Sequence, residues 1–367
     1  MRYLPFLLLL VFAGCEDEDC CVGPEPEGID ISSYDYSPES YELVVPESYR
    51  EFTIPAGNPL TQAGVELGRH LFYDKRLSSD STMSCASCHL SQLSFTDAAP
   101  VSTGVEGNQT LRSSMPLIDL VYATNGLFWD GRAQSLEEQA VLPVEDPVEL
   151  FENWDNVLAK LRRDELYHRL FREAFGINNT AEISRDLATK AIAQFERTMV
   201  SSGTSLYDQV VADQGVFFND SQQNGFDLFF DLPNDLPDAE CGHCHAIPTF
   251  TTHEYMNNGI DSVETLSDFV DKGFGETTGQ FIDNGKFRVP TLRNIELTAP
   301  YMHDGRFATL EEVIDHYNSG GHYAINLDSN IRPLGLSEQN KADLIAFLKT
   351  LTDTAFVNDP RFQNPFQ

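Results

Sequence analysis

Cys85-Ala86-Ser87-Cys88-His89 and Cys241-Gly242-His243-Cys244-His245 are the two stretches that decide how this chain folds. Each has the form Cys-x-x-Cys-His, in which two thiols can add to the vinyl groups of a porphyrin and the following His can bind its iron. A zinc ribbon would need its second cysteine pair nearby, whereas these pairs lie in opposite halves of the chain. A thioredoxin-type redox motif does not call for the trailing His. The pattern therefore predicts two covalently attached c-type haems, on His89 and His245.

The length of 367 residues and the placement of one motif in each half predict two domains, each large enough for its own core. Apolar residues recur at helical spacing in three places, and few segments alternate as strands do. The helical repeats are Leu60, Ala63, Leu67 and Leu71; Leu187, Ala191, Phe195 and Met199; and Leu344, Phe347, Leu348 and Leu351. We expect a mainly α fold of two cytochrome c-like domains, residues 56–212 and 213–367, each with one haem.

The N-terminus has the features of an exported bacterial protein. Residues 1–14 carry an early Arg and an apolar run too short to span a bilayer, which is typical of a secretory signal. The run ends at Cys15 and resembles a lipobox, in which the Cys becomes lipidated; ordinary signal cleavage nearby is the alternative. Residues 15–55 are acidic and contain several prolines, so we expect a tether. A location in the cell envelope, periplasmic or on the outer surface and anchored at Cys15, follows from these features.

The chain is strongly acidic. Its formal net charge is −33, from 24 Lys and Arg against 57 Asp and Glu. This charge disfavours nucleic acid and anionic lipid surfaces as partners, so the lipid anchor would be the only link to a membrane. It would attract a small basic redox protein, although solubility alone explains the acidity equally well.

Further sequence blocks surround the two motifs. They are Leu67 to Asp74, Phe95 to Asp97, Phe128 to Arg132, Ser135 to Ala140, Val289 to Asn294 and Leu297 to Gly305. In these blocks and in both motifs the chain resembles the bacterial di-haem cytochrome c peroxidase family, which also contains MauG. The resemblance covers nearly all of residues 59–355, with the blocks in the family's order.

The resemblance implies that the two haems differ in function. The haem on His89 would react with hydrogen peroxide, and the haem on His245 would receive electrons from a c-type cytochrome or a cupredoxin. Trp129 holds the position of a Trp that lies between the haems in the family. An indole there shortens the tunnelling gap for an electron, while packing in the core is the alternative reading of a lone Trp.

Peroxide cleavage needs a group that takes a proton from one oxygen and returns it to the other. In the family a Glu does this beside a Gln, and Glu149 and Gln139 stand at the family's offsets from Trp129. The resemblance therefore implies Glu149 as general acid and base, and Gln139 as a hydrogen-bonding residue of the pocket. A solvated surface acid is the alternative for any one Glu in so acidic a chain.

Two departures from the peroxidase pattern concern the iron ligands. Many family members hold a second His on the first haem, but this sequence has no His between His89 and Trp129. We therefore expect a first haem that is open to peroxide without prior reduction. At the second haem, Tyr317 stands where the peroxidases have a Met, as in MauG, and a phenolate would lower the haem potential. Met302 is the alternative ligand, and Tyr317 acting only in packing is a third reading.

The family also carries a calcium ion between its domains. Thr298 and Pro300 hold two of its ligand positions, and Ser114 stands where the family usually has Asn. Calcium accepts backbone oxygens and water readily, so the site can persist in weakened form. A homodimer is compatible with the resemblance.

Three functions follow from the sequence. The first is reduction of hydrogen peroxide to water with electrons from an external redox protein. The second is a MauG-like oxidase, which uses peroxide to oxidise a protein or organic substrate. The third is a di-haem cytochrome that only transfers electrons, and the lack of a second ligand candidate near the first haem counts against it.

Overall fold

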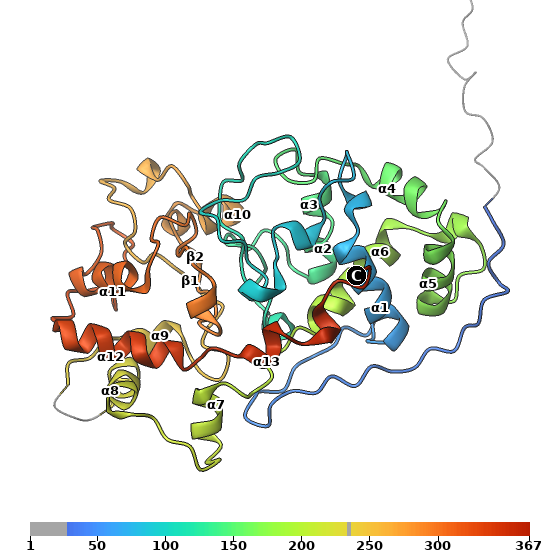
Figure 1. Ribbon diagram of the computed structural model, residues 1–367. Helices are drawn as coiled ribbons and strands as arrows, with labels where there is room; N and C mark the ends of the chain where they lie inside the picture. Colours follow the sequence, from blue (N-terminus) through green and yellow to red (C-terminus); the bar gives the residue numbers. More distant parts are fainter. Residues whose placement is uncertain (1–27, 233–235) are drawn as a thin grey trace, which may run out of the picture.

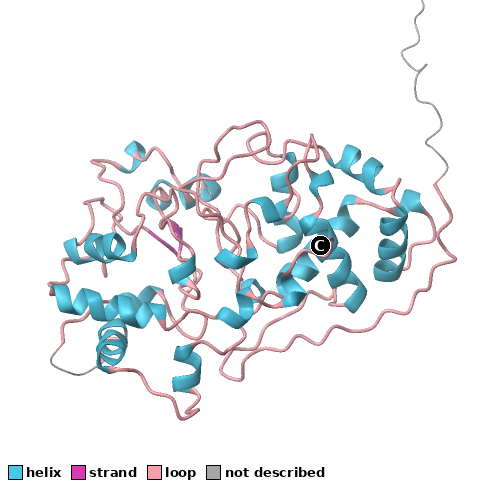
Figure 2. Cartoon of the chain, in the orientation of Figure 1, coloured by secondary structure: helices cyan, strands magenta, loops and turns pink. Residues whose placement is uncertain are grey.

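The computed structural model describes residues 28–232 and 236–367, and it confirms a largely helical fold (Figure 1, Figure 2). The helices of the N-terminal half are α1 (Gln62–Tyr73), α2 (Leu136–Gln139), α3 (Leu142–Glu145), α4 (Trp154–Leu161), α5 (Glu165–Phe175) and α6 (Arg185–Arg197). Those of the C-terminal half are α7 (Leu206–Val211), α8 (Asp220–Phe229), α9 (Cys241–Cys244), α10 (Phe274–Thr278), α11 (Leu310–Ser319), α12 (Glu338–Lys349) and α13 (Thr354–Val357). Within the described ranges one sheet occurs, in which β1 (Tyr255–Met256) pairs antiparallel with β2 (Phe287–Arg288).

Each half is built around a pair of helices that a glycine brings into close contact. In the N-terminal half α1 packs on α6, where a Cβ at Gly68 would lie 1.9 Å from the carbonyl oxygen of Ala191. In the C-terminal half α8 packs on α12, where a Cβ at Gly225 would lie 2.0 Å from the carbonyl oxygen of Asp343. A side chain at either glycine would force the helices apart, because close-packed backbones leave no room for it. The two halves thus repeat one design, with a haem motif after the first helix of each pair.

Three helices begin at a side-chain cap. The side chains of Thr61, Ser135 and Ser337 each accept a hydrogen bond from the amide three residues later, at 3.0, 3.1 and 3.2 Å. Such a cap satisfies one of the free N–H groups of the first turn and typically contributes about 1 kcal/mol. These caps set the starts of α1, α2 and α12.

The segment at the end of each half packs into the core of the other half. Phe356 and Phe362, near the C-terminus, are buried in the N-terminal half, and the Phe356 ring lies 5.9 Å from that of Phe95. Tyr207, before the expected boundary at residue 212, instead packs into the C-terminal core. Figure 1 shows the chain crossing back after α12, so that its end lies among helices of the N-terminal half.

Residues 28–55, expected to be part of a tether, lie against the globular body. Ile31 is buried in the N-terminal core, and the ring of Tyr49 lies 5.4 Å from the guanidinium of Arg293. The structure differs from this expectation because single apolar side chains can each fill a pocket of the globular body. They do so even where they do not recur at the spacing of a helix or a strand. The signal segment, Cys15 and the first part of the expected tether lie outside the described residues.

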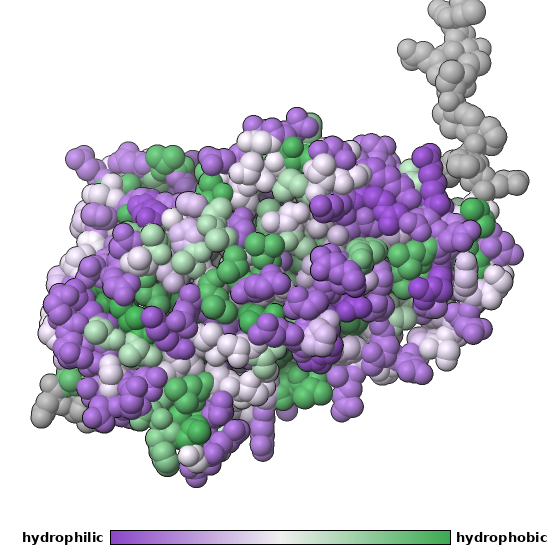
Figure 3. Space-filling view, viewed as in Figure 1, coloured by the Kyte–Doolittle hydropathy of each residue, from purple (hydrophilic) through white to green (hydrophobic). Residues whose placement is uncertain are grey.

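Hydrophilic side chains cover most of the face shown in Figure 3, in keeping with the excess of acids in the sequence. Apolar side chains lie between them in small groups. In the described parts of the chain, no helix is long and apolar enough to cross a membrane.

Phe356→Ala tests the packing of the C-terminal segment on the N-terminal half. We expect it to lower the free energy of unfolding by about 3–5 kcal/mol, the usual cost of truncating a buried Phe. Denaturant unfolding of the haem-loaded protein measures this loss. Phe281→Ala removes an exposed ring and should change the value by less than about 0.5 kcal/mol. Equal effects of the two substitutions would contradict this packing.

Candidate functional site

The first Cys-x-x-Cys-His motif forms a single helical turn beside a large cavity. The turn runs over Cys85–Ser87, and the Ser87 hydroxyl accepts a hydrogen bond from the Ser84 amide at 3.0 Å. Cys85 and Cys88 are unpaired thiols, and both line the cavity together with His89. This space, the first cavity, has a volume of about 650 Å³.

The second motif has the same local structure in the other half. Cys241 and Cys244 begin and end the short helix α9, and their thiols are also unpaired. With His245 they line a smaller space, the second cavity, of about 110 Å³. Each predicted motif therefore brings two thiols and one imidazole to the wall of one cavity.

In both halves a buried Phe turns its backbone carbonyl toward the motif His. The carbonyl oxygen of Phe95 lies 2.6 Å from Nδ1 of His89. In the second half, Nδ1 of His245 lies 3.2 Å from the carbonyl oxygen of Phe250 and 3.1 Å from that of Pro290. Both Phe residues have a left-handed backbone, with φ of 62° and 54°, which a residue with a Cβ rarely adopts. Because a carbonyl only accepts hydrogen bonds, Nδ1 carries the proton and Nε2 is left free to bind a metal.

Burial keeps both imidazoles in the neutral form that a metal ligand needs. It lowers the pKa of His89 below its ordinary value and that of His245 to about 4. Neutral imidazole, a free Nε2 and two reduced thiols fit covalent attachment of a haem at each cavity.

A buried cation adds a second observation in favour of a haem. Arg288 is buried and lines both cavities, and its Nε has no hydrogen-bond partner in the described structure. Its other nitrogens reach the Gly126 carbonyl (3.2 Å) and the Met115 sulfur (3.7 Å), but no carboxylate. A buried charge without a counter-ion is costly, so this side chain fits the carboxylate that each haem propionate would supply. Sequence analysis missed Arg288, which immediately precedes a recognised block.

Trp129 lies between the two cavities. It is buried and lines both of them. Its indole N–H donates to the Ser113 carbonyl at 2.9 Å, and its own carbonyl accepts from the Arg288 amide at 2.9 Å. The first bond orients the ring, and the second fixes the backbone that carries it.

Glu149 and Gln139 both line the first cavity, as the resemblance implied. Burial, with the nearby Asp146 carboxylate, raises the pKa of Glu149 to about 7, although the Arg132 guanidinium opposes the shift. A carboxyl with this pKa is populated in both protonation states at neutral pH, which is the property a proton-transfer group needs.

No His other than His89 lines the first cavity within the described residues. The cavity wall instead carries a second buried acid, Glu196 of α6. Burial raises its pKa to about 8, and its Oε2 has no hydrogen-bond partner. Glu196 was not identified from the sequence. A signal was available, because this acid lies one helical turn after the apolar Ile192 on a buried helix.

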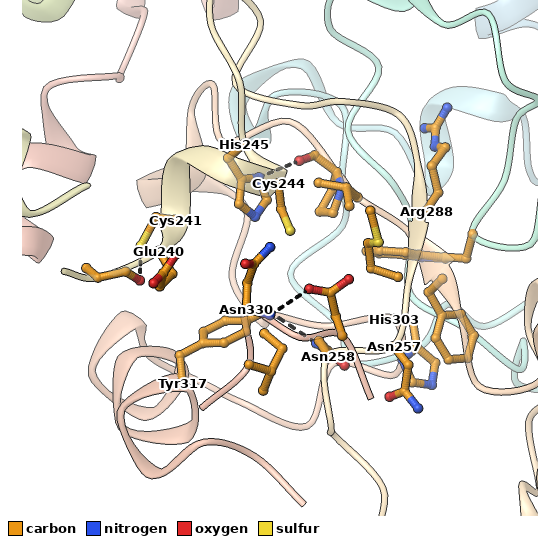
Figure 4. Close-up of a pocket in the computed structure, with 18 of the residues that line it drawn as sticks. Glu240, Cys241, Cys244, His245, Asn257, Asn258, Arg288, His303, Tyr317 and Asn330 are labelled. Carbon is orange, nitrogen blue, oxygen red and sulfur yellow. Dashed lines mark hydrogen bonds between the residues drawn. The ribbon is translucent and has the colours of Figure 1, made fainter. Parts of the chain in front are cut away.

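Tyr317 and His245 enter the second cavity from opposite sides, as Figure 4 shows. The Asn258 amide donates to the Tyr317 hydroxyl at 3.3 Å and to the Met302 sulfur at 3.5 Å. Met302 itself does not line the cavity, whereas Met256, which sequence analysis did not weigh, does. The geometry therefore brings Tyr317, rather than Met302, to the face opposite His245.

Two of the expected calcium ligands, Ser114 and Thr298, donate hydrogen bonds from their hydroxyl groups to different backbone carbonyls. The Ser114 hydroxyl donates to the Cys88 carbonyl at 2.7 Å, and the Thr298 hydroxyl donates to the Ile295 carbonyl at 3.3 Å. Calcium at Ser114, Thr298 and Pro300 stays a prediction.

Comparison with known proteins gives one consistent match. Residues 62–215 match the family model for di-haem cytochrome c peroxidase. MauG of Methylorubrum extorquens is 33% identical over 345 residues, covering 94% of this chain and 92% of that protein. The chain belongs to the di-haem cytochrome c peroxidase family. It is thus an oxidoreductase of a family with two haems, and the resemblance read from the sequence is confirmed.

The relatives of this chain carry two kinds of name. Cytochrome c551 peroxidase of Nitrosomonas europaea is 34% identical, with 85% of each chain covered. A solved structure of a MauG-like protein associated with microbial copper homeostasis is 34% identical with a TM-score of 0.81, over 89% of this chain and all of that one. Similarity at this level does not distinguish a peroxidase from a MauG-like oxidase.

Arg288→Met tests whether this side chain faces a haem carboxylate. We expect the midpoint potential of at least one haem to fall by about 60 mV or more, because loss of a buried positive charge favours oxidised iron. For one electron, about 60 mV is a tenfold change in the equilibrium constant for reduction. Spectroelectrochemical titration of the haem-loaded protein measures the shift. Arg361→Met removes an exposed cation and should leave both potentials unchanged. Unchanged potentials in Arg288→Met would refute the pairing.

Proposed function

We propose that this protein reduces hydrogen peroxide to water in the first cavity. The observation that carries the proposal is the pair of Glu149 and Gln139 on the wall of the cavity that His89 also lines. We further propose that both haems are of c type, attached through the paired cysteines, with His89 and His245 as iron ligands. When bound, the first haem supplies the iron that holds peroxide and delivers two electrons to it.

The protein's part in this reaction is proton transfer. The Glu149 carboxylate takes a proton from one oxygen of peroxide and returns it to the other as the O–O bond breaks and water leaves. Two electrons and two protons from outside complete the conversion of one peroxide to two waters. The Gln139 amide can donate a hydrogen bond within the same cavity.

Electrons enter on the side of the second cavity in this proposal. Trp129 lies on both cavity walls, so its ring shortens the gap that an electron crosses between the haems. The donor would be a small c-type cytochrome or cupredoxin with a basic face, which the net charge of −33 would attract. Export to the cell envelope with an anchor at Cys15, and a calcium ion between the halves, also belong to the proposal.

A MauG-like oxidase is the second candidate, because Tyr317 faces His245 across the second cavity. As a phenolate, Tyr317 would favour oxidised iron at the second haem. The two electrons that convert peroxide to water would then come from a protein or organic substrate, and the haems would supply the redox centres between that substrate and peroxide. A non-catalytic electron carrier has no use for Glu149 and Glu196, the two acids of the first cavity whose pKa values burial raises.

Addition of peroxide to the fully oxidised protein tests the open first site. We expect a reaction within the mixing time of a stopped-flow experiment, with no prior one-electron reduction, because no second His faces His89 in the described structure. Ascorbate-reduced donor protein consumed in step with peroxide would identify the peroxidase. A spectral change that persists without a donor and decays with an organic reductant would identify the oxidase. A reaction that requires prior reduction would contradict the open site.

Glu149→Gln tests the proton-transfer group. We expect the rate constant for the reaction with peroxide to fall by about 10²–10⁴, the usual contribution of a positioned acid or base. In the wild type this rate should rise with pH and level off above about 7, because the ionised carboxylate is the base. The substitution should abolish that rise. Glu145→Gln changes an exposed acid nearby and should keep both the rate and its pH profile; wild-type behaviour of Glu149→Gln would remove Glu149 from the mechanism.

A further inference from the structure

A second group of metal-ligating side chains lies beside the second haem motif. Asp231, Glu240 and His243 bring one ligand atom each to within 4.8 Å of one another, and they form the one such His, Cys, Asp and Glu group in residues 28–232 and 236–367. Asp231 follows α8, Glu240 precedes α9, and His243 lies between the two cysteines of the motif. Figure 4 shows Glu240 beside Cys241 at the edge of the second cavity.

The distances within this cluster suit a metal ion bound by all three side chains. His243 Nε2 lies 2.9 Å from Glu240 Oε2 and 3.6 Å from Asp231 Oδ2. In a tetrahedral site with bonds of about 2.0–2.2 Å, neighbouring ligand atoms lie about 3.4 Å apart. The two spacings to His243 fall on either side of that value, and the carboxylate oxygens of Asp231 and Glu240 lie within 4.8 Å of each other, so side-chain movements would complete the shell.

Other contacts orient the two carboxylates so that each offers one oxygen. Asp231 Oδ1 accepts hydrogen bonds from the amides of Ala239 (2.9 Å) and Glu240 (3.1 Å), which leaves Oδ2 toward His243. Glu240 Oε1 pairs with Arg332, which leaves Oε2 toward the same imidazole. The His243 side chain is 54% exposed, so an ion can reach the cluster from solvent.

We propose that Asp231, Glu240 and His243 bind a divalent first-row transition metal ion at the rim of the second haem site. One imidazole nitrogen and two carboxylate oxygens suit Zn²⁺ and Cu²⁺, with Cu²⁺ bound more tightly by the general affinity order. Two carboxylates match the charge of the ion, and water would fill the remaining position. The ligand His243 immediately precedes Cys244 in the sequence, so the ion would lie near the second haem. Its positive charge would raise the midpoint potential of the haem on His245.

Haem attachment should not depend on His243. In the first motif the position of His243 is taken by Ser87, so Cys-x-x-Cys-His does not itself require an imidazole there. His243→Ala should therefore still load both haems. His322, an exposed His of the same half, provides the matched control.

Equilibrium dialysis of the haem-loaded protein against Zn²⁺ tests the proposal. We expect one tight site in the wild type and in His322→Ala, and at least about tenfold weaker binding in His243→Ala, a loss typical even of residues that only support a ligand. Arg332→Gln should bind more tightly, since it removes a competing cation from Glu240. Asp231→Asn provides a second test in case His243→Ala fails to load its haems. It keeps the Oδ1 acceptor and should also weaken Zn²⁺ binding.

A second measurement uses Cu²⁺. Its EPR spectrum should show coupling to one imidazole nitrogen in the wild type, and that coupling should vanish in His243→Ala and persist in His322→Ala. Saturating Zn²⁺ should raise the midpoint potential of one haem in the wild type only. If His243→Ala or Asp231→Asn binds Zn²⁺ as the wild type does, the three side chains form only an ion pair with a protonated His, and the proposal is overturned.

Discussion

The hydrogen bond between a strained Phe carbonyl and the motif imidazole is the contact on which both halves depend. Phe95 and Phe250 are held in a conformation that costs free energy in isolation. Each is fully buried, so packing must supply the restraint. Phe95 contacts Phe356 from the far end of the chain, and Phe250 contacts Tyr207 and Phe347. The exchanged segments therefore help to hold each His with its free nitrogen toward a cavity.

From this common plan the two sites become unequal through their surroundings. The first cavity carries Glu149 and Glu196, two carboxyls whose pKa values burial raises to about 7 and about 8. The second carries Tyr317, whose pKa burial raises to about 12, opposite its His. Acids that titrate near neutral pH suit proton transfer, whereas a phenol suits control of the iron's potential. Trp129 and Arg288 lie on both walls and connect the two environments.

Local sequence signals predicted much of this arrangement. The two motifs predicted side chains that line the two cavities, and offsets from Trp129 predicted Glu149 and Gln139, which line the first cavity. Contacts between distant segments left no such signal. The return of Phe356 to the N-terminal half, the seating of Ile31 and the carbonyl of Phe95 arise from packing between residues far apart in sequence. Arg288 and Glu196 were missed because a single buried charge reveals its role only when its neighbours are known.

EPR spectroscopy of the fully oxidised, haem-loaded protein tests the inequality of the two sites most directly. We expect one high-spin ferric haem, at the open site of His89, and one low-spin ferric haem, ligated by His245 and Tyr317. Tyr317→Phe should alter the low-spin signal and leave the high-spin signal in place. Two low-spin haems in the oxidised wild type would show that the first site is closed and would contradict the account.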